Sequence, residues 1–187
     1  MSLEEYRAKR KPSTPEPFSS VVDRLGPLYF VIQLHRATRK HFDFRLEING
    51  VLVSWAVPRG ISDNPEDKRL ATRTEDHPFD YGAFEGAIPA GRYGAGEVLL
   101  WDFGTWFCDE NAPLPSSESD WFDPEFRKAH QDAALKALED GKLSVFLRGH
   151  RAKGSYFLVK TKEDYLMIKH RDAWANVHGA MEDILTS

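Results

Sequence analysis

The sequence predicts an all-β-dominated fold: a compact antiparallel β-barrel of about eight to nine strands, with one or two flanking helices. Three observations support this prediction. Nine short segments have strand-like patterning and are separated by turn signals at hairpin-like spacing. Two of them flank the dipeptide Asn49-Gly50, the strongest short signal for a β-hairpin. One segment, residues 124–140, has the end residues and apolar spacing of an α-helix.

Length and composition limit the function classes. A chain of 187 residues predicts one domain, expected over residues 21–187 and preceded by a flexible N-terminal arm at 1–20. The net charge of −4 excludes a global positive field, so a polyanion site must be a local cluster. The single cysteine excludes an internal disulfide and fits a reducing cytosol. No apolar run is long enough to cross a membrane, so we expect a cytoplasmic protein without a membrane partner.

The first half of the chain is expected to supply most of the strands. The arm at residues 1–20 carries Lys9-Arg10-Lys11 and several prolines, which favour a short helix at most and then an extended segment. This arm is either a disordered tail or a basic segment that lies across a substrate. Strands are predicted at residues 29–34, 41–48, 51–57 and 69–75, and tight turns in the glycine-rich stretch 82–96. Residues 98–101 and 105–108 are predicted to form a hairpin around Asp102-Phe103-Gly104.

The second half is expected to hold the one clear helix and the last strands. Asp123 is a natural N-cap, Pro124 suits the first helical position, and Gly141 suits the end of the helix. His130 falls off the apolar stripe of this helix, so we expect it to face solvent. Strands are predicted at residues 143–148, 155–160 and 166–170, and a short terminal helix at 172–181.

The predicted strand at residues 41–48 carries the strongest indication of chemistry. Successive side chains of a strand alternate between faces, so His41, Asp43 and Arg45 share one face and the phenylalanines between them share the other. The preceding strand ends at His35. Two imidazoles and one carboxylate form half of an octahedral shell that suits Mn, Fe(II) or Zn better than Mg or Ca. Barrel closure would put this polar face inside, around a ligand; the simpler alternative is a half-buried strand whose polar face meets water.

Several motifs together resemble the 3′-phosphoesterase domain of bacterial DNA ligase D and its stand-alone relatives. The resemblance covers residues 29–106 and resumes more weakly over 143–169. The motifs that carry it are FVIQLH at 30–35, HFDFRLE at 41–47, SWAVPRG at 54–60, EDHPFDY at 75–81, FEGAIP at 84–89 and YGAG at 93–96.

The resemblance implies a compact β-barrel that trims the 3′ ends of DNA, or of RNA-tipped DNA primers, during non-homologous end joining. A divalent metal, typically Mn²⁺ with Zn²⁺ or Co²⁺ as alternatives, would support two steps. A phosphodiesterase step removes a 3′-terminal ribonucleoside and leaves a 3′-phosphate, and a phosphomonoesterase step then leaves a 3′-hydroxyl. Implied partners are ligase and polymerase modules and the Ku protein, in the nucleoid.

The resemblance also assigns roles to individual residues. The implied metal ligands are His35, His41 and Asp43, and the implied phosphate-contacting catalytic pair is Arg45 and His77. Tyr81 matches a phenol that assists the monoesterase step. Three residues are implied to support the metal or bind phosphate: Gln33, Arg59 at a position where Lys is common, and Arg69. The chain departs from the family pattern where Lys11 replaces an expected Asp, and in a helical insertion near residues 109–141.

Two other functions remain open at this stage. A non-haem Fe(II) oxygenase would use His41 and Asp43 with a third ligand from downstream, among His77, His130 and His150. That hypothesis leaves His35 idle and the pair of Arg45 and His77 unexplained. A non-catalytic module that binds nucleic-acid ends predicts a damaged metal triad, whereas all three ligand residues are present.

Overall fold

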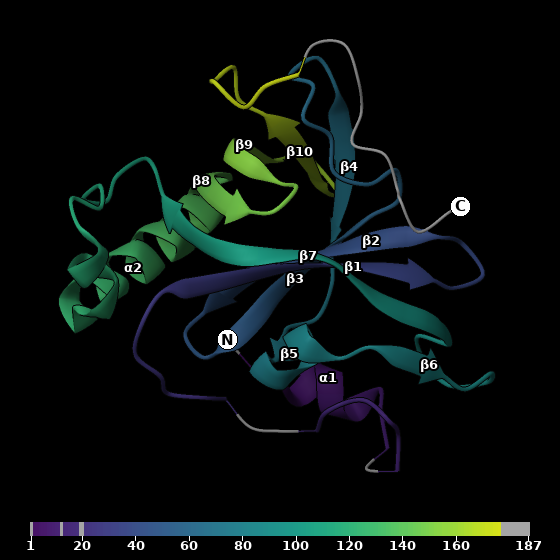
Figure 1. Cartoon of the computed structure of the whole chain (residues 1–187). Coiled ribbons are helices and arrows are strands. Elements are labelled where there is room, and N and C mark those ends of the chain that lie inside the picture. The colour runs from purple at the N-terminus through teal and green to yellow at the C-terminus, as the bar shows by residue number, and fades with distance from the viewer. Residues whose placement is uncertain (1, 12, 19–20, 177–187) are drawn as a thin grey trace.

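The structure, a computed structural model, describes residues 2–11, 13–18 and 21–176. Eight antiparallel strands follow one another in the order β1-β2-β3-β4-β10-β9-β8-β7, and pairing of β7 with β1 closes the barrel (Figure 1). The predicted barrel is therefore confirmed. Its strands are β1 (Leu28–Arg36), β2 (His41–Ile48), β3 (Val51–Val57), β4 (Lys68–Arg73), β7 (Gly96–Cys108), β8 (Lys142–Gly149), β9 (Lys153–Lys160) and β10 (Tyr165–Lys169).

Smaller elements lie outside the barrel wall. The short strand β5 (His77–Pro78) pairs with β3, and β6 (Gly86–Ile88) pairs with β7. Between them runs a 3-10 helix over Phe79–Ala83. The N-terminal helix α1 (Glu4–Ala8) lies beside β5, on the same side of the barrel as β6 (Figure 1). Tyr6 of α1 and Tyr81 of the 3-10 helix form a cluster with Val31 of β1 and Leu52 of β3, so these elements pack on the outer face of the barrel.

The hairpin of β2 and β3 is formed as the dipeptide Asn49-Gly50 predicts. Both turn residues have positive φ, 49° at Asn49 and 78° at Gly50, as a two-residue hairpin turn requires. Gly50 is also needed for space, because a Cβ there would lie 2.1 Å from the carbonyl oxygen of Val22. The turn sets the register Ile48↔Val51 and therefore decides which side chains face the core.

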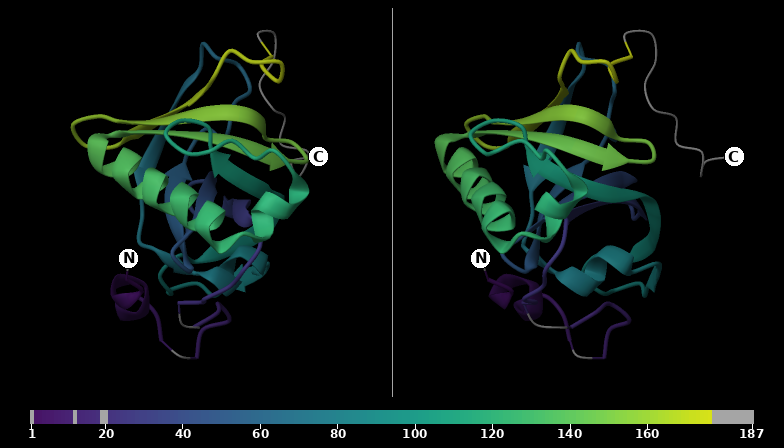
Figure 2. Two further views of the ribbon diagram at one scale, coloured as in Figure 1. Left: turned by 90° about the vertical axis from the view of Figure 1, so that its left-hand side faces the viewer. Right: turned by 60° about the vertical axis from the view of Figure 1, so that its left-hand side comes forward.

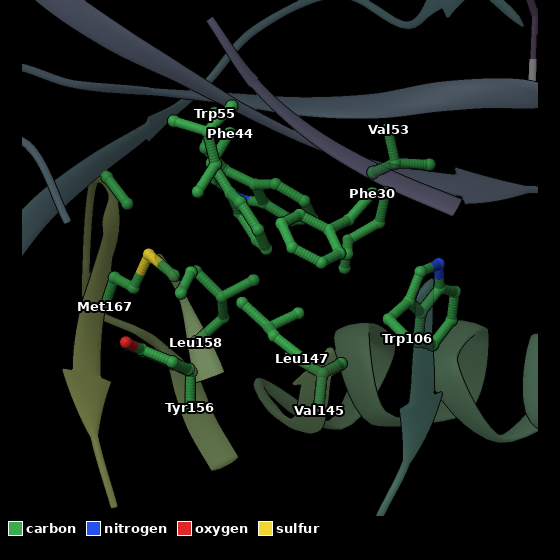
Figure 3. Packing of buried hydrophobic residues seen from close by; sticks show 14 of the residues in the cluster. Phe30, Phe44, Val53, Trp55, Trp106, Val145, Leu147, Tyr156, Leu158 and Met167 are labelled. Atoms are coloured by element: carbon green, nitrogen blue, oxygen red, sulfur yellow. The ribbon is translucent and has the colours of Figure 1, made fainter. Parts of the chain in front are cut away.

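Apolar side chains fill the inside of the barrel. Figure 3 shows Phe30, Phe44 and Trp55 projecting from one wall toward Leu158 and Met167 on the opposite wall. An eight-stranded barrel is just wide enough for such side chains to fill its interior. The expectation that the polar face of residues 41–48 points inward is therefore wrong: the phenylalanines occupy the interior and the polar residues point outward.

The helix α2 (Pro124–Asp140) has the predicted ends and packs against β8 (Figure 2). The Asp123 side chain accepts the Glu125 N–H at 2.9 Å, and Gly141 adopts a φ of 88°. The expectation of a solvent-facing His130 is wrong. This side chain is 1% exposed, and its Nδ1 accepts the Cys108 N–H at 3.1 Å. The helix is covered on this second side because the end of β7, at Phe107 and Cys108, packs there.

The predicted hairpin at residues 98–108 is also wrong, because β7 is one continuous strand of 13 residues. The Asp102 side chain bonds to a segment that is distant in the sequence, the turn between β8 and β9. Its carboxylate accepts the N–H groups of His150, Arg151 and Ala152 at 3.0, 3.0 and 2.8 Å. Gly104 allows β7 and β8 to approach closely, because a Cβ at this position would lie 2.2 Å from the carbonyl oxygen of Arg148.

Two further expectations concern the strand at residues 69–75 and the chain end. The strand is found one residue earlier and ends sooner, as β4. In the predicted terminal helix, residues 172–174 form a bend and a turn, and the part from residue 177 onward lies outside the described residues. Within the described part of the chain, no helix is long and apolar enough to cross a membrane.

Candidate metal and phosphate site

The three predicted metal ligands meet where β1 ends and β2 begins. Antiparallel pairing puts His35 opposite His41, and Asp43 follows two residues later on the same outward face. One ligand atom from each residue lies within 4.8 Å of the others. The Asp43 carboxylate is central, with its oxygens 3.8 Å from His35 Nδ1 and 3.7 Å from His41 Nε2. The local hairpin geometry thus assembles a His-His-Asp cluster.

Backbone carbonyls orient both imidazoles toward this cluster. His35 Nε2 lies 2.9 Å from the Gly94 carbonyl oxygen, and His41 Nδ1 lies 2.9 Å from that of Arg39. A carbonyl only accepts, so these nitrogens carry the protons and the opposite nitrogens offer lone pairs to the cluster. Metal-ligating histidines are held in this way. Burial also lowers the pKa of His35, which keeps its imidazole neutral. The donor set therefore fits a divalent transition metal.

Arg45 is the next residue on the same face of β2, and it is 2% exposed. Its guanidinium donates to Asp43 Oδ2 at 3.0 Å, to Ser54 Oγ at 2.9 Å and to Gln33 Oε1 at 2.9 Å. Gln33 in turn donates to the carbonyl oxygen of Tyr81 at 2.8 Å. The cation is therefore held in one orientation beside the metal ligands, as a site for a phosphate oxygen requires.

The polar face of β2 ends in a purely structural residue. Glu47 is fully buried and forms ion pairs with Arg24, at 3.0 Å, and with Arg127 of α2. Asp43 is 7% exposed. The simpler alternative, in which this face meets water, is therefore excluded.

The side chains of His77 and Tyr81 are in contact with each other and lie next to Arg45. Their ring centroids are 4.7 Å apart, and the Arg45 Cζ lies 4.8 Å from the Tyr81 ring centroid. His77 donates from Nδ1 to the Glu75 carbonyl oxygen at 2.8 Å, which leaves Nε2 with a lone pair. Burial and the charges of Arg45 and Arg10 hold the pKa of His77 well below its usual value. Burial raises the pKa of Tyr81 to about 12, so at neutral pH the phenol keeps its proton.

The N-terminal segment packs against His77 and Tyr81. Tyr6 of α1 is fully buried, and its ring meets those of His77 and Tyr81 edge-on at centroid distances of 5.1 and 6.1 Å. Arg10 stacks on the Tyr6 ring at 3.9 Å and donates to Glu75 Oε1 at 3.0 Å. The segment expected as a flexible arm thus contributes pocket residues. Sequence spacing gave no signal for Tyr6, Arg10 or Glu75 as site residues, because 65 residues separate Arg10 from Glu75.

One pocket of about 180 Å³ is lined by the His-His-Asp cluster and by Arg45, His77, Tyr81, Arg10 and Glu75. A second pocket of about 250 Å³ shares Arg10 and Tyr93 with it and adds Lys9, Lys11 and Arg92. Lys9 is paired with Glu5 and Glu75 at 2.6 and 3.1 Å. A chain with a net charge of −4 therefore still concentrates cations next to the metal ligands.

The other predicted residues lie elsewhere. Arg59 is exposed in the turn after β3, and Arg69 on β4 donates to Asp67, just before that strand, at 2.7 Å. Neither lines the two pockets, so their phosphate-binding roles stay predictions. His150 contacts the Phe103 ring at the turn after β8, and His130 packs between Phe107 and Phe126. The residue that completes the metal cluster is His35, which the oxygenase hypothesis leaves idle.

Comparison with known proteins gives a consistent result. Residues 33–160, more than half of the chain, match the family model described as the DNA ligase D 3′-phosphoesterase domain. The chain is 44% identical over 164 residues to a multifunctional non-homologous end joining DNA repair protein, LigD, of Mycobacterium tuberculosis. It is 40% identical over 181 residues to LigD of Pseudomonas aeruginosa, and 40% identical over 164 residues to LigD of Mycolicibacterium smegmatis.

These matches cover 87%, 92% and 86% of the chain, respectively, and the chain spans 19% of the length of each relative. The matched residues include every strand of the barrel wall from the middle of β1 to the end of β9. The metal cluster, Arg45, His77 and Tyr81 all lie inside the matched range. By its fold, its site and its similarity, the chain belongs to the family of the DNA ligase D 3′-phosphoesterase domain.

Proposed function

We propose that this chain is a metal-dependent phosphoesterase that processes the 3′ ends of DNA, or of RNA-tipped DNA, in non-homologous end joining. One observation carries the proposal. A His-His-Asp metal cluster and a buried group of Arg45, His77 and Tyr81 line the same pocket, next to a second pocket rich in cations. Membership of the 3′-phosphoesterase domain family supports the same reaction class.

The proposed metal is Mn²⁺, with Zn²⁺ or Co²⁺ as alternatives. Two imidazole nitrogens and one carboxylate oxygen suit these ions better than Mg²⁺ or Ca²⁺, which prefer oxygen ligands. When bound by His35, His41 and Asp43, the ion supplies positive charge that polarises a phosphoryl oxygen. The protein residues around it supply orientation, hydrogen bonds and exclusion of water.

Arg45 is proposed to hold the reacting phosphate. Its guanidinium already has one orientation, fixed by Gln33, Ser54 and Asp43, so little entropy is lost when it receives a phosphate oxygen. In a pocket from which water is excluded, this charge stabilises the negative charge that develops on the phosphoryl oxygens. His77, which is neutral, can accept or return a proton at Nε2, and Tyr81 can donate its phenolic proton to an oxygen of the phosphate.

The proposed reaction has two steps. In the first, water replaces the 5′-oxygen of a terminal ribonucleoside at phosphorus, so the ribonucleoside leaves with a proton and the strand keeps a 3′-phosphate. In the second, water replaces the 3′-oxygen of the strand, which leaves a 3′-hydroxyl and inorganic phosphate. Tyr81 is assigned to the second step, in which the group that departs is the strand itself.

The adjacent cationic pocket is proposed to hold the strand that enters the site. Lys11 and Arg92 are exposed there, and Tyr93 offers a ring that is 49% exposed. Phosphates dominate the affinity of such contacts, and an aromatic ring accepts any base. Two or three local cations suit a protein that binds ends rather than long duplex.

The names of the relatives suggest the wider setting. They are multifunctional proteins of non-homologous end joining, and this chain corresponds to a fifth of their length. We propose that it acts beside ligase and polymerase modules and Ku in the cytoplasm, at the nucleoid.

The proposal is tested with an end-labelled primer–template whose primer ends in one 3′ ribonucleotide. We expect Mn²⁺-dependent shortening to a 3′-phosphate and then to a 3′-hydroxyl. EDTA and Asp43→Ala should abolish both products. Tyr81→Phe should make the 3′-phosphate accumulate, because the phenol is assigned to the second step. Asp132→Ala, at an exposed acidic residue on α2, is the control for the loss of one carboxylate.

Retained Mn²⁺ binding by calorimetry without any cleavage would contradict the catalytic proposal and favour a module that only binds ends. Cleavage that persists in Asp43→Ala would contradict the metal assignment. Oxidation of a small organic substrate with Fe(II) and dioxygen, without cleavage, would instead favour the oxygenase hypothesis.

A further inference from the structure

A groove of about 470 Å³ lies on the outer face of the hairpin formed by β8 and β9. It is lined by Phe146, Arg148, Lys153 and Trp174, with the backbone of Leu147 and Gly149. None of these residues lines the metal pocket. The groove therefore combines two cations and two aromatic rings at a place that the proposed chemistry does not use.

The two cations face each other across the hairpin. Arg148 pairs directly with Lys153 in the β8–β9 register. Like charges opposite each other on one face of a sheet are destabilising. Among the described residues, no ion pair within 4.0 Å joins either cation to a carboxylate. Arg148 Cζ lies 5.7 Å from the Trp121 ring centroid, and Lys153 Nζ lies 5.4 Å from that of Trp174. An anion between them would remove this repulsion.

The indole of Trp174 is exposed but firmly placed. It is 51% exposed, although its backbone N–H donates to Asp172 Oδ1 at 2.9 Å. Asp172 is itself fixed, since Lys169 Nζ and the Ser155 N–H donate to it at 2.7 Å. A Cβ on Gly154 would lie 2.8 Å from Trp174 Cδ1, which shows how closely this segment packs on β9. A ring held in place at the surface is prepared for stacking.

The turn between the two cations is fixed as well. The three consecutive N–H groups of residues 150–152 donate to Asp102, which is 3% exposed. Arg148 and Lys153 flank this turn, so their Cα positions are set by a buried carboxylate on β7. The groove is thus built on rigid elements, as a binding site requires.

We propose that this groove binds single-stranded DNA, with a phosphate between Arg148 and Lys153 and a neighbouring base stacked on Trp174. Cationic tracks with aromatic platforms are the general means of binding single strands without sequence preference. An acidic peptide would neutralise the cations but has no group that needs an exposed indole. That this DNA strand belongs to the molecule whose 3′ end enters the metal pocket rests on the proposed function.

The groove lies far enough from the metal pocket to contact a different part of the strand. His35 and Tyr29 are six residues apart on β1, which is about 20 Å at ~3.3 Å per residue. Tyr29 pairs with Thr105 of β7, and Thr105 pairs with Arg148. A stacked strand with its 3′ end in the metal pocket, at ~3.4 Å per nucleotide, reaches the groove after about six nucleotides, and a more extended strand reaches it after fewer.

The test is the binding of a fluorescein-labelled oligothymidylate of about 20 nucleotides to the full chain in EDTA, by fluorescence anisotropy at several salt concentrations. For the double variant Arg148→Ala/Lys153→Ala we expect weaker binding and a salt slope smaller by about 0.7, because the one phosphate contact that the two cations share is lost. Trp174→Ala should weaken binding at least about fivefold without changing the slope. An abasic strand should remove the effect of Trp174→Ala.

Two controls separate these effects from folding and from net charge. Lys128→Ala/Lys136→Ala removes two exposed cations from α2 and should leave the salt slope unchanged. The exchange Arg148→Lys/Lys153→Arg keeps both charges and should bind as the wild type does. An unchanged slope in the alanine double variant would overturn the proposal. Equal loss of binding to polyaspartate, with no effect of Trp174→Ala, would overturn the assignment to a nucleic-acid strand.

The outcome is independent of the catalytic proposal. Cleavage of 3′ ends with an unchanged salt slope in the double variant would refute the groove alone. Weakened strand binding in that variant, with no cleavage by any form of the chain, would refute the phosphoesterase and leave the groove in place. A primer of about two nucleotides, which is too short to span ~20 Å, should be cleaved equally by wild type and double variant.

Discussion

The Arg45 guanidinium makes three hydrogen bonds and still has N–H groups left to donate to a phosphate. Its guanidinium meets three acceptors from β1, β2 and β3, and only one of them, Asp43, is a carboxylate. The other two hold the plane of the guanidinium without neutralising its charge. We therefore expect its geometry, as much as its charge, to matter for the reaction.

Arg45→Lys tests this point. A lysine keeps the positive charge but presents a single ammonium group, so it cannot reach Gln33, Ser54 and Asp43 together. We expect cleavage of the primer to slow by about a hundredfold, as for loss of one oriented donor to a developing oxyanion. Mn²⁺ affinity by calorimetry should change little. Arg171→Lys, at an exposed ion pair with Glu66, is the matched control, and equal rates for Arg45→Lys and wild type would contradict an oriented role.

At this scale, the sequence predicted what local geometry determines. His35, His41 and Asp43 could be grouped because the two-residue period of a strand and one turn place them together. Tyr6 and Arg10 could not be assigned to the site in this way, because their position next to His77 depends on packing between segments far apart in the chain. The phosphate-contacting role of His77 came only from the resemblance to a family, since His before Pro in a loop has many uses.

At the scale of elements, β7 fixes the turn between β8 and β9 through one carboxylate. Asp102 receives four backbone N–H groups, one from Phe103 and three from the turn after β8. The local sequence Asp-Phe-Gly suggested a turn, but this long-range bonding and the close approach at Gly104 keep the strand extended. By contrast, the β2–β3 hairpin and α2 were predictable, because their signals, Asn-Gly and the capping residues, act on adjacent residues.

Asp102→Asn should therefore destabilise the protein without affecting the metal site. The amide is nearly the same size but loses the charge, and its NH₂ group faces backbone donors instead of accepting from them. Charge-assisted bonds are each worth about 1.5–3 kcal/mol, so we expect the free energy of unfolding in urea to fall by about 3 kcal/mol. Asp132→Asn on α2 should have almost no effect. A decrease confined to Mn²⁺ affinity would contradict this account.

At the scale of the whole molecule, buried histidines make stability depend on pH. Burial lowers the pKa of His35, His77 and His130 below the ordinary value. In the unfolded chain these groups bind protons near pH 6.5, whereas the folded chain binds fewer. Below that pH the unfolded state therefore gains protons that the folded state does not, and stability falls.

The contribution of His77 can be isolated with His77→Gln. Each pH unit below about 6.5 should cost the wild type about 1.4 kcal/mol for this group as long as its folded form stays neutral. We therefore expect the free energy of unfolding, measured in urea with EDTA, to fall less between neutral pH and about pH 5 in the variant than in the wild type. An equal fall in both proteins would show that His77 titrates normally in the folded state.

The inner face of the barrel wall holds the apolar core, and the outer face of β2 holds the proposed metal and phosphate residues. Along β2, the side chains of Phe42, Phe44, Leu46 and Ile48 belong to the interior, and those of His41, Asp43 and Arg45 line the pocket, so no residue serves both. Heat resistance and turnover could therefore be improved separately in the laboratory. Stabilising substitutions could be sought in the interior of β1–β3 and changes in substrate choice in the pocket, so the usual conflict between a stable enzyme and an active one would be weak here.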